Sequence, residues 1–257
     1  MIMEKMMRER IKYLMGKKAF HISMLIVILV IILFTVGIII LKYNVEGETN
    51  MPFCLNKVTI VSSVEGTDKD AGENRWAFDI SQNNDFYFYI QKNKSYEKQE
   101  AIKEIVIDNI IVQKENEKGT INFYRPNTTE SGGNYKNTQE NLIQSIEYKG
   151  ALETNLKNLE ISNQGGIAMF RYANDNIAEY ISNDEEIKHN ELLQKAGISE
   201  EDLKAKISID MTIKIESGKE YKTNTSFDLP IEGVVENGTS SKEIIDTSDI
   251  IFKRIKN

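Results

Sequence analysis

The sequence has few of the residues on which most enzyme and metal chemistry depends. Its 257 residues include one cysteine, two histidines, one tryptophan and three prolines. A lone cysteine cannot form an internal disulfide, and the cysteine and histidine counts are too low for a usual zinc site. A nucleophilic serine or cysteine normally needs a histidine base, yet His21 and His189 lie on opposite sides of an apolar segment of membrane length. These shortages predict a protein that is not an enzyme and has no catalytic residues, cofactor or metal.

One long uncharged run, residues 22–41, is interrupted only by Ser23, Thr35 and Gly37. Twenty helical residues span about 30 Å, the thickness of a bilayer's hydrocarbon core. The first twenty residues carry six basic and two acidic side chains, a charge of +4, whereas the rest of the chain carries −11. Basic flanks stay on the cytoplasmic side. We therefore expect a single-pass protein of the cell membrane that contacts the lipid bilayer through residues 22–41, with a cytoplasmic N-terminus and an extracellular C-terminal domain.

Other interpretations of this run are less favoured. A buried core helix would show polar positions at helical spacing. A cleaved signal peptide has a shorter apolar part and an A-x-A-like site, and the exit sequence IIILKYNVEGETN has none. A lipoprotein carries its cysteine directly after the run, but Cys54 lies thirteen residues beyond Leu41, and a pilin-like leader needs a glutamate where Met24 stands. We interpret the run as a retained anchor and Cys54 as an ordinary buried thiol.

Beyond the anchor the pattern changes to short runs in which apolar and polar residues alternate. Alternation with period two places one set of side chains on a buried sheet face and the other in solvent. The connections SQNND and KENEKG have the composition of hairpin turns. The segments that qualify as strands are residues 57–64, 75–80, 85–90, 104–112 and 120–124.

The chain also resembles itself, which indicates an internal repeat. FDISQNNDFYFY from Phe78 matches LEISNQGGIAMF from Leu159, and EIVIDNII from Glu104 matches KISIDMTI from Lys206. Chance similarity among alternating strands is the other explanation. The simplest account is a mainly β fold with two tandem β-sandwich-like (immunoglobulin-like) modules. The second carries a short helical insertion, in which Gly197 is placed to end the first helix and a second short turn follows from Ser199. The expected parts are a basic cytoplasmic tail (1–21), the transmembrane helix (22–41), a linker (42–52), a first extracytoplasmic module (53–149) and a second (150–257) with its helical insertion at about 184–205.

Aromatic residues give the clearest sign of a binding surface. If Tyr87 and Tyr89 lie on an exposed sheet face, then together with Trp76 they form a flat platform that suits a sugar or a protein partner. The alternative is that these rings pack against the second module or against the short helical crossing. The string NQGG from Asn163 predicts a turn with positive φ or a close approach of strands at its glycines. A calcium loop in DKDAGEN from Asp68 is disfavoured, because Gly72 stands where a ligand belongs.

Several strings together resemble a group of single-pass membrane proteins from low-GC Gram-positive bacteria: LEISNQGGIAMFRY, ISNDEEI, FDLP and the terminal IFKR. The resemblance implies membrane localisation and assigns no activity or site residue. Our first functional hypothesis is a non-enzymatic interaction or scaffold protein with a protein or cell-surface partner. The second is a glycan- or small-ligand-binding ectodomain, and the third is a carboxylate-based cell-wall hydrolase. The acidic exterior argues against nucleic acid as a partner.

Overall fold

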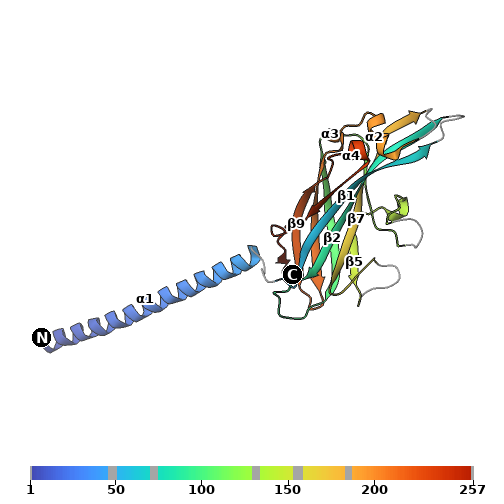
Figure 1. Cartoon of the computed structure of the whole chain (residues 1–257). Helices are drawn as coiled ribbons and strands as arrows, with labels where there is room; N and C mark the ends of the chain where they lie inside the picture. The colour runs from blue at the N-terminus through green and yellow to red at the C-terminus, as the bar shows by residue number, and fades with distance from the viewer. Residues whose placement is uncertain are drawn as a thin grey trace. The chain divides into compact units, whose positions relative to one another are not determined.

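The computed structural model describes residues 2–45, 51–69, 75–128, 134–152, 159–182 and 187–255 (Figure 1). The chain divides into two compact units, Met1–Glu48 and Thr49–Asn257. Half of the residues are in strands, so the fold is mainly β with two sheets and one long N-terminal helix.

The first unit is the helix α1 (Ile2–Val45), which contains 44 residues. Its apolar side chains between Ile22 and Ile40 are exposed, which distinguishes α1 from the core helix of a soluble domain. The helix is long and apolar enough to cross a bilayer. It begins well before the predicted segment at residue 22, because the basic N-terminal tail is also helical.

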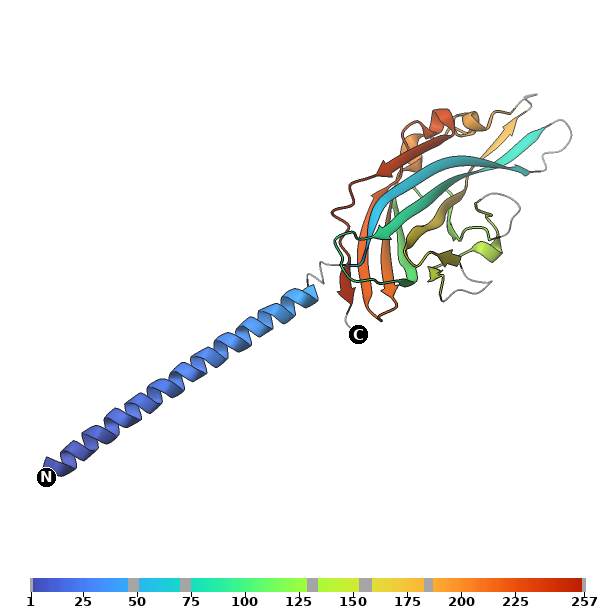
Figure 2. The same ribbon diagram turned by 60° about the horizontal axis from the view of Figure 1, so that its bottom comes forward.

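The second unit is a sandwich of two sheets with long, curved strands (Figure 2). Sheet A has the order β10-β1-β2-β7-β4, and sheet B has the order β11-β9-β8-β3-β5-β6. The strands of sheet A are β1 (Phe53–Lys69), β2 (Trp76–Lys92), β4 (Thr120–Tyr124), β7 (Gly165–Ser182) and β10 (Thr239–Ile244). Those of sheet B are β3 (Ile102–Lys114), β5 (Ile146–Gly150), β6 (Leu159–Ile161), β8 (Ala205–Ile215), β9 (Glu220–Asp228) and β11 (Lys253–Ile255). All neighbours pair antiparallel except β5 and β6.

The predicted pair of tandem modules is not confirmed. Residues of the two predicted halves meet in both sheets, because β2 pairs with β7 and β3 pairs with β8, and a single compact unit contains them all. The matched segments are neighbours in the sheets: Ile107 lies opposite Met211, and Asp108 lies opposite Asp210. Adjacent strands that cover the same core need the same alternation, which explains the similarity without two modules.

The predicted turn at SQNND is wrong, because residues Ser81–Asp85 lie inside the continuous strand β2. All five residues pair with β1, and residues 82–85 also pair with β7 on the other side. Gln82 and Asn84 are turned inward, where Gln82 Nε2 donates to Ser62 Oγ at 2.9 Å and Ser62 Oγ donates to Asn84 Oδ1 at 2.6 Å. Polar residues that would favour a turn in isolation are held in the strand by these buried hydrogen bonds.

This polar layer separates two hydrophobic clusters along the inner face of β2. The larger cluster fills the main sandwich and includes Phe86 and Phe170, whose rings stack with centroids 4.9 Å apart. The smaller cluster surrounds Phe78 and Ile80 and is covered by short helices. These are η2 (His189–Glu191), α2 (Leu192–Lys195), α3 (Glu200–Leu203) and α4 (Val234–Asn237), while η1 (Gln139–Asn141) lies elsewhere, in the β4–β5 segment.

The helical insertion is present as η2, α2 and α3, within the predicted range. Gly197 has φ of 70° directly after α2 and terminates it, as predicted. Leu192 and Leu193 are buried against the core. The start of the predicted insertion lies outside the described residues.

Candidate functional site

The three residues of the predicted aromatic platform are not brought together. Tyr87 and Tyr89 share the outer face of β2 and are half-buried, and Lys57 Nζ lies 4.5 Å from the centre of the Tyr89 ring. Trp76 lies at the other end of β2, eleven positions from Tyr87, and its odd spacing from Tyr87 places it on the opposite face of the strand. There its ring stacks with that of Phe78 at 6.5 Å and remains 49% exposed. A ligand platform at Tyr87 and Tyr89 stays a prediction.

A polar groove lies on the outer face of sheet A, with a volume of about 420 Å³. Its lining comes from β1 (Glu65, Thr67), β2 (Asp79, Ser81), β4 (Thr120, Asn122, Tyr124), β7 (Asp175, Asn176) and the segment at the start of η1 (Asn137, Gln139). Each of these side chains carries a hydrogen-bonding oxygen or nitrogen. The lining contains three carboxylates and no lysine, arginine or histidine. The groove therefore favours a ligand that can form many hydrogen bonds and is not an anion.

A bulge in β7 shapes the floor of the groove. The β2–β7 register runs from Ile80 opposite Ala178 to Gln82 opposite Asn174, so Ser81 alone faces three residues of β7. Asn176 takes positive φ, 56°, and its N–H donates to Ser81 Oγ at 3.1 Å. Bulges redirect side chains out of the regular alternation and are common beside functional sites. This bulge places both Asp175 and Asn176 in the lining.

Hydrogen bonds hold the groove carboxylates in place. Asp175 Oδ2 accepts from Asn122 Nδ2 at 2.8 Å and from the Tyr124 hydroxyl at 2.9 Å. Burial, together with the bond to Asp175, raises the pKa of Tyr124 to about 12, so the hydroxyl stays protonated at neutral pH. Glu65 accepts from the buried Asn83, and Asp79 is paired with Lys69 at 2.8 Å. Rigid acceptors of this kind are preorganised for a ligand's donors.

Asn137 and Gln139, from the described part of the segment between β4 and β5, form one wall of the groove. This segment can be followed beside the sheet in Figure 2. Arg171 binds it to the sheet: the guanidinium donates to both carboxylate oxygens of Asp85, at 2.6 and 3.0 Å, and to Asn137 Oδ1 at 3.1 Å. The guanidinium carbon also lies 4.6 Å from the ring centre of Tyr135. Burial raises the pKa of Tyr135 well above its ordinary value. Asp85 therefore neutralises the charge of Arg171, and the guanidinium holds the segment of Asn137 against the sheet.

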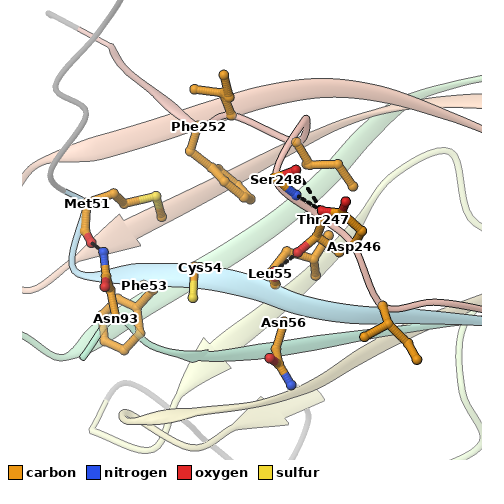
Figure 3. Close-up of a pocket in the computed structure, with 13 residues that line it drawn as sticks. Met51, Phe53, Cys54, Leu55, Asn56, Asn93, Asp246, Thr247, Ser248 and Phe252 are labelled. Carbon is orange, nitrogen blue, oxygen red and sulfur yellow. Dashed lines mark hydrogen bonds between the residues drawn. The ribbon is translucent and has the colours of Figure 1, made fainter. Parts of the chain in front are cut away.

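A second depression, the C-terminal cleft, has a volume of about 460 Å³ and is lined by residues from 51–56, by Asn93 and by residues from 245–252 (Figure 3). β10 pairs with β1 only between Val58 and Ser63, so it leaves the edge of β1 before the cleft. Phe252 belongs to the main core, while Ile245 and Ile251 are 72% and 55% exposed. The Thr247 hydroxyl donates to the carbonyl oxygen of Leu55, so the chain after β10 still contacts this edge. The cleft thus combines a strand edge that has no ladder partner with exposed apolar side chains.

Cys54 is a free, half-buried thiol in the lining of this cleft, and Figure 3 shows it pointing away from Phe252.

The glycines of NQGG behave as the sequence predicts. Gly165 has φ of 118°, and a Cβ there would lie 2.5 Å from the carbonyl oxygen of Ile90. Within the described ranges, no group of three or more His, Cys, Asp and Glu side chains could hold a metal ion. The DKDAGEN loop lies mostly outside those ranges.

The outer face of sheet B presents carboxylates in a different setting. Glu104 on β3 contacts Lys149 on β5 and lies 2.6 Å from Lys214 on β8. Asp210 accepts from Lys222 at 2.8 Å and from Asn224 at 2.7 Å. Burial raises the pKa of Asp210, but the bonds from Lys222 and Asn224 outweigh it and the pKa is lowered. Lysines on neighbouring strands therefore neutralise this face.

Comparison with known proteins gives no relative from which a function could be inferred. No family model, no curated protein and no solved structure matches the chain. The resemblance to membrane proteins of low-GC Gram-positive bacteria stays a prediction, and the function is argued from the site.

Proposed function

We propose that this protein is a membrane-anchored, non-enzymatic binding protein whose extracytoplasmic domain binds a hydroxyl-rich ligand of the glycan class in the polar groove. The observation that carries the proposal is the lining: every side chain can form hydrogen bonds, three are carboxylates, and none is a cation. A sugar hydroxyl both donates and accepts, so it can bind a carboxylate and an amide at once. Tyr124 is buried and contributes its protonated hydroxyl to the lining.

The charge of the groove sets the ligand's charge. Asp79 is paired with Lys69, but Glu65 and Asp175 are held by amides and a hydroxyl and keep their charge. A polyanion would be repelled by those like charges across the groove. A neutral glycan donates its hydroxyl hydrogens to those carboxylates, and an amino sugar adds an ionic attraction. We therefore propose a preference for neutral or amino-bearing glycans over sulfated or phosphorylated ones.

The anchor supports the proposed location. α1 is long and apolar enough to cross a bilayer, and its basic N-terminal flank favours a cytoplasmic N-terminus with the sandwich outside. Protease treatment of intact cells tests this orientation. Digestion of the sandwich with survival of the first twenty residues is expected, and the reverse pattern would show that the topology is wrong.

Binding is favoured over hydrolysis by the state of the groove carboxylates. A glycosidase needs one carboxyl group as a proton donor and a second free to attack or to activate water. Asp175 accepts two hydrogen bonds from neighbouring side chains, and Asp79 is paired with Lys69. We therefore expect retention of intact glycan without turnover, and release of reducing ends by the purified full-length protein would revive the hydrolase alternative.

The groove is tested with full-length protein in nanodiscs on a panel of neutral, amino-bearing and sulfated glycans. Thr67→Arg introduces a bulky cation into the groove from an exposed position and should lower the affinity at least about 10-fold, or 1.4 kcal/mol. Ser226→Arg makes a comparable change on the outer face of sheet B, where Ser226 is exposed, and should leave the affinity unchanged. Absence of binding across the panel, or equal effects of the two variants, would contradict the proposal.

A second candidate function is capture of a protein partner at the C-terminal cleft, in line with an interaction or scaffold role. The exposed Ile245 and Ile251 beside the end of β1 favour it, because exposed apolar side chains are a feature of protein interfaces. A photo-crosslinking residue at Ile245 in intact cells tests this candidate. The control is the same residue at Ile111, which is 48% exposed on another strand; equal crosslinking at both positions would remove the support.

A further inference from the structure

The helix α1 extends some twenty residues beyond the N-terminal end of its apolar run. This extension contains Lys5, Arg8, Arg10, Lys12, Lys17 and Lys18 against only Glu4 and Glu9. Its described side chains, including Met3, Met7 and Ile11, are exposed. The extension is therefore a cationic helix with no covering partner among the described residues, covalently joined to a membrane-spanning segment.

The extension is amphipathic when it is helical. Met3, Met7 and Ile11 follow one another at intervals of four residues, so they fall within an arc of about 80° at 3.6 residues per turn. Lys5, Arg8 and Lys12 follow at intervals of three and four residues on a different face. Arg10 falls beside the apolar arc, from which a long arginine side chain can reach headgroups. A separate apolar stripe and basic stripe are typical of helices that lie in the membrane interface.

Geometry decides how the basic stripe can reach lipid. On a straight helix along the bilayer normal, Lys5 would lie about 26 Å beyond Ile22 at 1.5 Å per residue. That exceeds the headgroup layer, about 5–8 Å thick per leaflet, plus a Debye length of about 8 Å. If the helix bends near Gly16, Lys5, Arg8 and Lys12 all lie at the surface. The helix is continuous through Gly16 in the structure. Gly16 is the weakest helix former in the extension, so it is the position at which a bend costs least.

We propose that residues 3–13 form an amphipathic helix that binds anionic lipid headgroups in the leaflet on the side of the N-terminus, after a bend at Gly16. Charge complementarity selects the lipid surface: each basic residue near an anionic leaflet strengthens binding about 5-fold, or roughly 100-fold for the three residues of the stripe. Met3, Met7 and Ile11 enter the boundary between headgroups and acyl chains. The inference rests on the proposed membrane anchoring and is independent of the groove.

The test uses full-length protein in nanodiscs of phosphatidylcholine, with or without phosphatidylglycerol. A Cys54→Ser, Met7→Cys variant carries an environment-sensitive fluorophore at residue 7. We expect a blue shift in the anionic discs that is absent from the neutral discs and is reversed at about 1 M salt. The triple variant Lys5→Gln, Arg8→Gln, Lys12→Gln should lose the shift, whereas Lys5→Arg, Lys12→Arg should keep it.

A charge-matched control is Lys94→Gln, Lys98→Gln, Lys253→Gln, which changes exposed lysines of the sandwich and should keep the shift. Equal shifts in both lipids, or a shift that survives in the triple variant, would overturn the inference. An unshifted fluorophore in both lipids would also overturn the inference, and it would favour a soluble acidic partner for the extension. Failure of the chain to enter the discs would overturn anchoring and inference together, while loss of glycan binding alone would affect only the groove.

Discussion

The outer faces of the two sheets both carry acidic residues, but these residues have different partners. On sheet B, Glu104 lies between Lys149 and Lys214, and Asp210 is paired with Lys222. In the polar groove of sheet A, amides and a tyrosine hydroxyl take the place of most of those lysines. Lysine removes the negative charge of a carboxylate, whereas an amide orients the carboxylate and leaves its charge. The difference separates a face that stabilises the fold from a face suited to binding.

The largest expected effect comes from the support beneath the groove. Arg171→Met removes both hydrogen bonds to Asp85, whose side chain is only 13% exposed. It leaves a nearly buried carboxylate without a partner and should lower the free energy of unfolding by about 3–5 kcal/mol. Chemical denaturation of the sandwich measures this loss. Adding Asp85→Asn should recover part of it, and a loss below about 1 kcal/mol would show that the pair is not structural.

A smaller loss of stability is expected on sheet B. Glu104→Gln leaves Lys149 and Lys214 without their shared counter-ion, at a site where the Glu104 side chain is 11% exposed. The free energy of unfolding should fall by about 1.5–3 kcal/mol, the range for hydrogen bonds to charged groups. Glycan affinity should not change. A change in affinity would mean that the two faces are not independent.

The matching substitution in the groove should lower the glycan affinity and leave the stability almost unchanged. Glu65→Gln keeps an oxygen to accept from Asn83 but removes a charge from the lining. Affinity for a neutral glycan should fall about 10-fold, or 1.4 kcal/mol, with the free energy of unfolding changed by less than about 0.5 kcal/mol. Calorimetric titration and denaturation of the same preparation measure both. A large loss of stability with unchanged affinity would assign Glu65 to the fold.

The smallest effect is a pH dependence on sheet B. Because the pKa of Asp210 is lowered in the folded protein, its ionised form stabilises the fold above its ordinary value, near pH 4, and that contribution is lost as the pH falls further. Asp210→Asn should therefore cost about 1 kcal/mol at pH 7. The difference from the unmodified protein should shrink below about pH 4. A difference that stays constant on acidification would contradict this role.

The strand pattern was readable from the sequence wherever the inner residues are apolar. Residues 104–112 and 120–124 lie in β3 and β4, and residues 57–64 in β1. The pattern failed at Gln82 and Asn84, because Gln82 Nε2 and Asn84 Oδ1 form hydrogen bonds with Ser62 inside the sandwich. A local pattern cannot show that two strands distant in sequence will supply such partners.

The groove was missed for a related reason. Its residues come from four strands and from the η1 segment, and Asp175 and Asn176 enter the lining only through the bulge opposite Ser81. The polar run Asn174–Asp175–Asn176 between the apolar stretches of β7 was the available signal, since Asn tolerates positive φ. For Trp76 and Tyr87 the sequence suggested one shared surface, because both are aromatic and lie in the same part of the chain. The structure places them on opposite faces of β2.

By itself, the sequence determined the long apolar segment, its charged flank and the alternation of the strands, because each depends on residues that are close along the chain. Tertiary structure decided that the β region is one sandwich and that a polar groove lies on sheet A. Both depend on which strands pair and in which register, and a shift of one residue sends every side chain of a strand to the other face. Local composition does not contain that register.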